Sequence, residues 1–195
     1  MTTRLEIVNA MLAVNGEAPA SSVESTNPAV IQAVNALDRL NKKVQARGWW
    51  FNKETIMLSP DTDGIVVLPQ NTLSVDPVDP NSPYVQRGES LYDRINNTRV
   101  ISEQVNCRLK LLLDVEEVPE TAAAYLMDKA CKEYYTDDDG DEQKIRNLEK
   151  REAESYAYFF REHLANEDTN IRRSRLGKKL AYGHTSNAIY INKGA

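Results

Sequence analysis

The segment NKKVQARGWWFN, residues 41–52, is where the chain changes from one kind of secondary structure to another. Before it, apolar side chains recur every three or four residues, which predicts an amphipathic helix that ends near Arg47. Gly48 is the expected end of that helix, because glycine adopts the left-handed backbone conformation at little cost. The aromatic residues that follow predict the first β-strand, which reaches Leu58.

Helical periodicity extends over four segments of the chain. The helix before Gly48 is expected to begin at Thr26, a suitable N-cap, with Pro28 in its first turn. A third helix is expected from Pro119, and the acidic turn Asp137–Glu142 separates it from the fourth. The predicted helices therefore cover residues 3–14, residues 26–47, a segment from residue 119, and a segment from the acidic turn to about residue 166.

The middle third of the chain has a different pattern. Its short segments are rich in β-branched and aromatic residues and are separated by Pro, Gly, Asn and Asp, which predicts antiparallel strands with a hairpin at Gly88. The proline-rich Asp76–Pro83 cannot be a central strand. The predicted strands are Trp50–Leu58, Gly64–Leu68, Thr72–Val75, Pro83–Gln86, Ser90–Tyr92, Thr98–Ile101 and Arg108–Val115.

These segments predict an α+β fold, a bundle of about four helices with an antiparallel β insertion between the second and third helices. We expect one body, residues 1–169, in which the helical parts are 1–48 and 117–169 and the β insertion is 49–116. An extended C-terminal arm, residues 170–195, follows the body.

The arm and the body have opposite charges. The arm carries six positive charges and no acid; since the whole chain carries −5, residues 1–169 carry −11. A DNA-reading protein needs its positive charge on the folded body, so this pattern favours a body that repels DNA and an arm that docks on an acidic protein partner. The alternative is a non-specific grip on DNA by the arm. The docking residues we expect are Arg172, Arg173, Arg175, Lys178 and Lys179, with Ile189, Tyr190 and Ile191 as apolar anchors that add a strand to a partner's sheet.

Cofactor and metal sites are not predicted. The two cysteines, Cys107 and Cys131, form no C-x-x-C and are expected to be free and buried. The histidines, His163 and His184, belong to no zinc motif, and His163 is expected at a solvent-facing or rim position. Gly177-Lys178-Lys179 lacks the other residues of a phosphate loop.

The acidic turn is not a calcium loop either. Placing Gly140 at the sixth position of an EF-hand loop puts Tyr135 at the first position and Arg146 at the twelfth, where carboxylates are needed. We therefore expect an acidic turn that leads into a helix. Neither a signal-peptide core nor an apolar run of membrane-spanning length is present, so no membrane partner is expected.

Four carboxylates leave an enzymatic alternative open. Asp114, Glu116, Glu117 and Glu120 lie close together in the sequence, and a pair of carboxylates can hydrolyse a glycan by acid–base catalysis. However, they fall just before and inside the start of a helix, where acids are expected for electrostatic reasons alone. We expect no enzymatic activity.

Two blocks together carry a resemblance to a known family. LNKKVQARGWWFN, residues 40–52, fits the pattern I-N-x-x-I-Q-x-R-G-W-x-F-N, and YVQRGESLYDR, residues 84–94, fits Y-V-x-R-G-x-x-x-Y-D-R. In this order and at this spacing, the chain resembles the tail tubular protein A family of short-tailed bacteriophages. The motif residues that carry the resemblance are Arg47, Gly48, Trp49, Phe51, Tyr84, Arg87, Gly88, Tyr92, Asp93 and Arg94.

The resemblance implies a structural protein of the virion tail, assembled in the host cytoplasm. It implies a homo-oligomeric ring of twelve subunits at the head–tail junction, between the portal protein and the nozzle, which is tail tubular protein B. Tail fibres are a further candidate partner, and genomic DNA would pass through the ring without specific binding. Two alternatives remain open, a tail-associated hydrolase of peptidoglycan or capsule, and a regulatory or chaperone-like helical module outside the virion.

The motif residues are expected to have structural roles. Alternation along a strand places Trp50 and Asn52 on one side of it and Trp49 and Phe51 on the other, one side anchoring the junction and the other meeting a neighbour. In the second block, Arg87 and Arg94 flank a hairpin with Asp93 and are expected to form structural salt bridges rather than a phosphate clamp.

Overall fold

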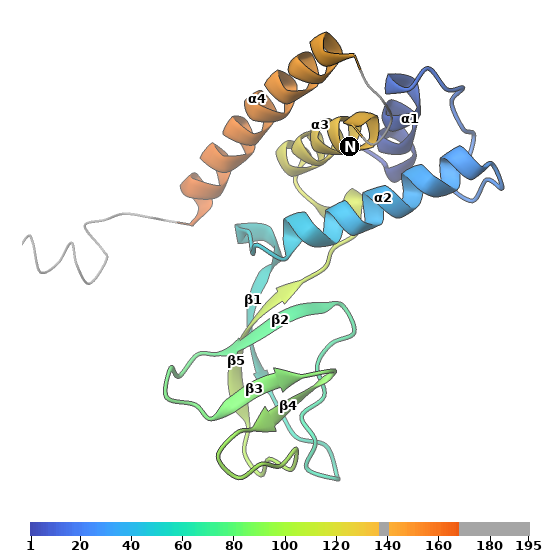
Figure 1. The fold of residues 1–195 in the computed structure, drawn as a ribbon. Coiled ribbons are helices and arrows are strands. Elements are labelled where there is room, and N and C mark those ends of the chain that lie inside the picture. The colour runs from blue at the N-terminus through green and yellow to red at the C-terminus, as the bar shows by residue number, and fades with distance from the viewer. Residues whose placement is uncertain (137–140, 168–195) are drawn as a thin grey trace, which may run out of the picture.

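The computed structural model describes residues 1–136 and 141–167, which form a helical lobe and a β lobe (Figure 1). The fold is α+β, with antiparallel strands between the second and third helices, as predicted. The helices of the described residues are α1 (Arg4–Val14), α2 (Pro28–Gln45), α3 (Glu120–Thr136) and α4 (Glu142–Asn166).

The helix starts follow from their capping residues. Thr3 caps α1 in a reciprocal arrangement, in which its hydroxyl accepts from the Glu6 N–H and the Glu6 carboxylate accepts from the Thr3 N–H. The N-cap of α2 is Asn27 and not Thr26, because Pro28 occupies the first helical position and the cap is the residue before it.

The core of the helical lobe lies between α1, α2 and α3. Residues 122, 126, 130 and 134 of α3, which recur at helical spacing, are buried. Helix α4 packs along α3 (Figure 1), and its Glu152 forms ion pairs with Lys129 and Lys132 of α3 at 2.8 and 2.5 Å. No helix of the described residues is long and apolar enough to cross a membrane.

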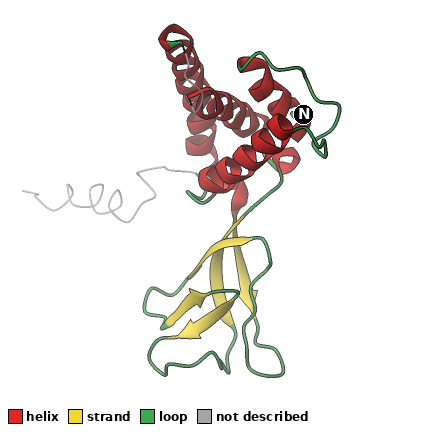
Figure 2. Ribbon diagram, turned by 45° about the vertical axis from the view of Figure 1, so that its right-hand side comes forward, coloured by secondary structure: helices red, strands yellow, loops and turns green. Residues whose placement is uncertain are grey.

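Five strands form the β lobe, seen in Figure 2 below the helices. Three of them make an antiparallel sheet in the order β1-β5-β2, and the other two make a hairpin that turns at Gly88, as predicted. The strands are β1 (Lys53–Leu58), β2 (Thr72–Pro77), β3 (Tyr84–Arg87), β4 (Ser90–Asp93) and β5 (Val105–Leu111).

Several strand predictions need correction. Trp50–Asn52 is a turn of 3-10 helix, so the first strand begins at Lys53 and not at Trp50. Gly64–Leu68 and Thr98–Ile101 form only isolated bridges. The last strand starts and ends earlier than predicted, because Asp114 begins a second 3-10 turn, Val115–Glu117. Pro77 lies at the end of β2, an outer strand of the three-stranded sheet, which agrees with its predicted exclusion from a central strand.

Both cysteines are free and buried, as predicted. Cys107 belongs to the core of the β lobe, and Cys131 belongs to the core of the helical lobe. Burial raises the pKa of the Cys131 thiol to about 11 and also raises the pKa of Cys107. The two thiols are therefore unreactive at neutral pH.

Candidate functional site at the junction of the lobes

Gly48 lies in the connection between α2 and the β lobe. Its φ angle is +81°, in the left-handed region, and its N–H donates to the Gln45 carbonyl at 2.9 Å. A Cβ atom at this position would lie 2.7 Å from Cε and 2.9 Å from Cδ of Lys110 on β5. Gly48 therefore has the predicted left-handed conformation, but α2 ends at Gln45 with Ala46 as its C-cap, two residues before the predicted Arg47. Two features require glycine at position 48, the backbone conformation and the close approach of Lys110.

Replacing Gly48 by valine is expected to lower the free energy of unfolding by about 1–2 kcal/mol or more, since a β-branched residue is strained at positive φ. The clash with the Lys110 side chain adds less to this cost, because that side chain is flexible. The matched control is Arg47→Ala at the neighbouring position, which removes an exposed cation–π contact and is expected to cost about 0.5–1 kcal/mol. Urea unfolding of both variants measures the difference, and equal midpoints would contradict it.

Three aromatic residues after Gly48 surround one ring of α4. Trp49 is 2% exposed, donates from Nε1 to the Val44 carbonyl at 2.8 Å, and has its ring centroid 4.3 Å from that of Phe159. The centroids of Trp50 and Phe51 lie 5.6 and 6.2 Å from the same ring. The predicted division of these residues between two faces of a strand is wrong, because the 3-10 turn directs all three toward Phe159.

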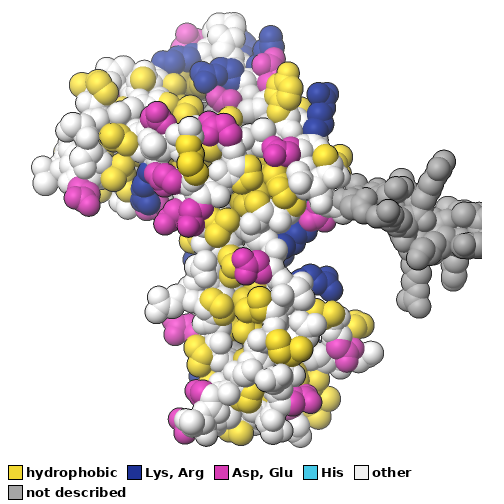
Figure 3. Space-filling view, turned by 180° about the vertical axis from the view of Figure 1, so that it is seen from behind, with side chains coloured by type: hydrophobic (Ala, Val, Ile, Leu, Met, Phe, Trp, Pro, Cys, Tyr) yellow, Lys and Arg dark blue, Asp and Glu magenta, His cyan; other side chains and the backbone are white. Residues whose placement is uncertain are grey.

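Arg47 covers this aromatic cluster from the outside. Its guanidinium carbon lies 5.2 Å from the Trp49 ring centroid, and its Nη1 donates to the Tyr156 hydroxyl at 3.1 Å. Arg47 therefore ties the end of α2 to α4 by a cation–π contact and a hydrogen bond. Figure 3 shows hydrophobic side chains where the helical lobe narrows toward the β lobe.

Buried amide side chains connect the two segments of the chain that pass between the lobes, the end of α2 and the segment after β5. Asn52 is 1% exposed and donates from Nδ2 to the carbonyls of Gln45 and Leu111, at 3.0 and 2.8 Å. Its Oδ1 accepts from the Trp49 N–H at 2.7 Å. Gln45 in turn exchanges hydrogen bonds with both backbone groups of Leu113, at 2.8 and 2.9 Å. The end of α2 and the segment after β5 are thus held side by side.

The contacts of Phe159, Asn41 and Gln45 were not predicted from the sequence. A usable signal exists for the amides, because Gln45 and Asn41 occupy the same helical face as the buried Leu37. Polar residues on an apolar face predict buried hydrogen bonds. The contact of Phe159 with residues 49–51 could not be predicted, since nothing local to α4 indicates it.

His163 lies at the edge of the aromatic cluster, a rim position as expected. Its ring centroid is 5.1 Å from that of Trp49 and 5.8 Å from that of Trp50, and its Nδ1 is buried without a hydrogen-bond partner among the described residues. Burial lowers the pKa of His163; nearby Lys53 and Arg47 act in the same direction, and Glu167 opposes them.

This lowered pKa predicts a loss of stability in acid. The unfolded chain binds a proton at His163 more readily than the folded chain, so stability is full above the ordinary histidine pKa of about 6.5 and falls as the pH drops below it. We expect the free energy of unfolding to decrease more between pH 7.5 and 5.5 for the natural protein than for His163→Phe, by urea titration. Equal decreases in the two proteins would exclude a contribution of His163 to the acid sensitivity. Carboxylates titrate in both proteins, so their contribution to the free energy of unfolding cancels in the comparison.

The second sequence block forms the β3–β4 hairpin. Gly88 has φ +70° at the turn, and the guanidinium of Arg87 lies 3.6 Å from the Tyr92 ring centroid. Arg94 donates from both its backbone N and its Nε to the Pro83 carbonyl, at 3.2 and 3.3 Å. Tyr84 donates to Glu103 at 2.6 Å, and this hydrogen bond raises the Tyr84 pKa to about 12.

The predicted salt bridges of this block are wrong for the described residues. Asp93 instead accepts from the N–H groups of Ile95 and Asn96 and from the Asn96 side chain, at 2.8, 3.1 and 2.7 Å. The hydrogen bonds from Asn96 lower the pKa of Asp93. Local amide donors thus satisfy the carboxylate, and the two arginines bind an aromatic ring and a carbonyl.

Of the four candidate catalytic carboxylates, Glu116, Glu117 and Glu120 accept hydrogen bonds from residues near the N-terminus or in a turn. Glu116 accepts from the Arg4 N–H at 2.7 Å, and Glu117 accepts from the Asp114 N–H at 3.2 Å. Glu120 accepts from the Thr2 N–H and hydroxyl, and these bonds lower its pKa. A general acid needs a raised pKa, so Glu120 has the wrong shift for that role.

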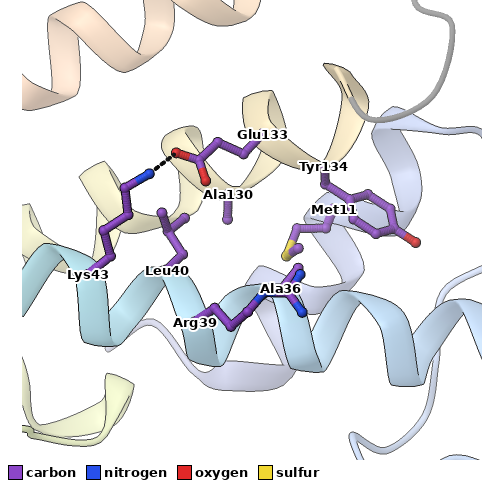
Figure 4. Close-up of a pocket in the computed structure, with 8 residues that line it drawn as sticks. All are labelled: Met11, Ala36, Arg39, Leu40, Lys43, Ala130, Glu133 and Tyr134. Carbon is purple, nitrogen blue, oxygen red and sulfur yellow. Dashed lines mark hydrogen bonds and ion pairs between the residues drawn. The ribbon is translucent and has the colours of Figure 1, made fainter.

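A small pocket of about 270 Å³ opens between α1, α2 and α3 (Figure 4). Met11, Leu40 and Ala130 contribute apolar side chains, and the Lys43–Glu133 ion pair, at 3.5 Å, lies toward one end. The lining offers neither a nucleophile nor a cluster of metal ligands, and no group of three metal-ligating side chains occurs in the described part of the chain.

Some predicted residues lie outside the described ranges. They are residues 137–140 of the acidic turn, His184, and all the expected docking residues: Arg172, Arg173, Arg175, Lys178, Lys179, Ile189, Tyr190 and Ile191. Asp141, the residue after the turn's undescribed part, caps α4 by accepting from the Gln143 N–H at 2.9 Å.

Comparison with known proteins agrees with this architecture. The family model of the tail tubular proteins matches residues 5–169. Tail tubular protein A of Klebsiella phage KP34 is 29% identical over 177 residues, which are 90% of this chain and 95% of that protein. The match includes both lobes and the junction between them. The chain therefore belongs to the tail tubular protein family and is a structural protein of a bacteriophage tail.

Proposed function

We propose that this protein forms the adaptor ring at the head–tail junction of a short-tailed phage. Twelve copies would surround a channel, with the portal protein on one side and the nozzle, tail tubular protein B, on the other. The family match over residues 5–169 carries the proposal, because it spans the whole helical lobe and β lobe and the relative has almost the same length.

The charge of the chain supports a channel role. Residues 1–169 carry −11, and an acidic wall repels DNA phosphates over about 8 Å at physiological ionic strength. Genomic DNA can then pass during ejection without binding specifically to the ring. A wall that attracted DNA would retain it through the release of counterions.

The junction supports a mechanical role. Trp49 and Phe159 pack tightly, and the amides of Gln45 and Asn52 connect α2 with the segment after β5. These contacts fix the β lobe to the helical lobe, so each lobe can meet a different neighbour while the spacing between the neighbours is kept. An adaptor between two rings of different proteins needs such a fixed spacing.

In this proposal the basic residues of 170–195 dock on the portal, and the ring assembles in the host cytoplasm before it becomes part of the virion tail. Tail fibres are a candidate partner of the outer surface. We propose no enzymatic activity, since Glu116 and Glu120 accept hydrogen bonds from the backbone of residues 2–4.

Imaging of purified particles by cryo-electron microscopy, with cross-linking mass spectrometry, tests the proposal. The expected result is a ring of this chain between portal and nozzle, with cross-links to both proteins. Absence of the chain from particles, or a location away from the head–tail junction, would contradict it. Clearing of peptidoglycan or capsule by the purified protein, lost in Glu116→Gln, would contradict the assignment as a non-enzyme.

A further inference from the structure

Strand β1 has one paired edge and one open edge. Residues 53–58 pair continuously with β5, from Lys53 opposite Lys110 to Leu58 opposite Val105. Along the other edge, no strand or backbone group of the described residues is bonded to β1. The side chains of this strand agree with an accessible edge, because Glu54 and Thr55 are exposed and Met57 is 57% exposed.

The other outer strand of the same sheet is protected. The N–H of Val75 on β2 donates to the Gln86 side chain at 3.2 Å, and a register shift interrupts β2 between Thr72 and Ser74. Such devices prevent an edge from pairing with another chain. Strand β1 has neither a register shift nor a proline in residues 53–58, so its edge remains able to accept a strand.

The chain leaves the described structure beside this edge. Helix α4 ends at Asn166, and the next residue, Glu167, forms an ion pair with Lys53, the first residue of β1. The aromatic contacts of Phe159 and His163 with Trp50 hold the same end of α4 in place. Glu167, the last described residue, therefore lies next to a strand with one open edge among the described residues.

Residues 168–195 contain a segment suited to such an edge. Ala188-Ile189-Tyr190-Ile191 is their longest apolar run, and Ile and Tyr favour strands. Ile56 of β1 is only partly buried against the core of the β lobe, so an added strand would cover it further. We propose that residues 188–191 of one copy add a strand to the open edge of β1 in the next copy.

Pairing with the next copy, unlike pairing within one chain, would also link neighbouring subunits of the ring. This inference rests on the proposed ring, in which every copy offers one open edge of β1 and one apolar segment, residues 188–191. If each copy donates residues 188–191 to the next copy around the ring, the open edge of β1 is filled in every copy. Twenty residues, 168–187, separate the anchored Glu167 from the strand, and they reach up to about 66 Å when extended. The basic residues within this connection remain available to the portal.

Site-directed cross-linking in particles tests the inference. Tails would be assembled from two versions of the chain, one with Tyr190→Cys and the other with Thr55→Cys, and treated with a short bis-maleimide. The matched control replaces Thr55→Cys by Ile95→Cys, at a position that is 74% exposed but lies outside the β1 sheet. Cys107 and Cys131 are buried, so they do not compete.

We expect a covalent dimer of the two versions in at least fivefold higher yield with Thr55→Cys than with Ile95→Cys. Equal yields in particles that contain a complete ring would overturn the inference and leave the proposed function intact. Particles without a ring of this chain would overturn both. Met57→Cys serves as a second acceptor position if Thr55→Cys does not assemble. A double variant that cross-links only within one chain would place the strand on its own β1 and also overturn the inference.

Discussion

Replacing Trp49 by alanine is expected to lower the free energy of unfolding by about 3–5 kcal/mol, the usual cost of removing a buried tryptophan. The indole is 2% exposed, packs 4.3 Å from Phe159 between ring centroids, and donates a hydrogen bond to Val44. Alanine leaves a cavity at the junction and removes the hydrogen bond from the indole to the Val44 carbonyl. A change of this size is a large part of the stability of an ordinary domain.

Urea unfolding followed by far-ultraviolet circular dichroism measures this change. The matched control is Trp50→Ala, which removes the same side chain from a half-buried position with a longer contact to Phe159, 5.6 Å between centroids. We expect a clearly smaller cost for this control. Equal costs for the two variants would mean that the burial of Trp49 does not determine the stability of the junction.

Deleting residues 170–195 is expected to abolish attachment of the protein to portal-bearing heads. The deletion removes all six positive charges of the arm and the apolar residues 188–191, while the buried residues of the three core clusters lie within residues 7–159. The circular dichroism spectrum and the melting temperature should therefore remain nearly unchanged. Binding to heads is measured by cosedimentation.

A shorter deletion, of residues 192–195, provides the matched control, because it removes one positive charge and keeps the proposed anchors. The protein that lacks residues 192–195 should still attach to portal-bearing heads. Normal joining of the 1–169 protein to heads would exclude the docking role of the arm. Unfolding of the 1–169 protein would instead place the arm within the folded body.

The helices could be predicted from the sequence because their causes are local. The apolar stripes, the cap at Thr3, Pro28 and the left-handed Gly48 all act within a few residues of the chain. The same holds for the hairpin at Gly88. Three helix starts were misplaced by a single residue, as at Asn27, where two adjacent residues were both able to cap. Helix α2 ends at Gln45, two residues before its predicted end.

The errors arose where distant or competing partners decide the structure. Residues 50–52 form a 3-10 turn because Asn52 binds Gln45 and Leu111 and the aromatic rings meet Phe159, which is more than one hundred residues away. Asp93 had nearby arginines as candidate partners, yet the amides of residues 95 and 96 were closer in the turn. The motif positions were predictable, but their partners depend on the tertiary structure.

The hydrogen bond from Asn52 to Leu111 has a consequence for how the family can vary. It joins the two ends of the β lobe, residue 52 before β1 and residue 111 at the end of β5, at a distance of 2.8 Å. The β lobe is therefore a closed module whose entry and exit coincide. A change in the length of the β lobe between residues 52 and 111 therefore need not alter the path of α2 or α3.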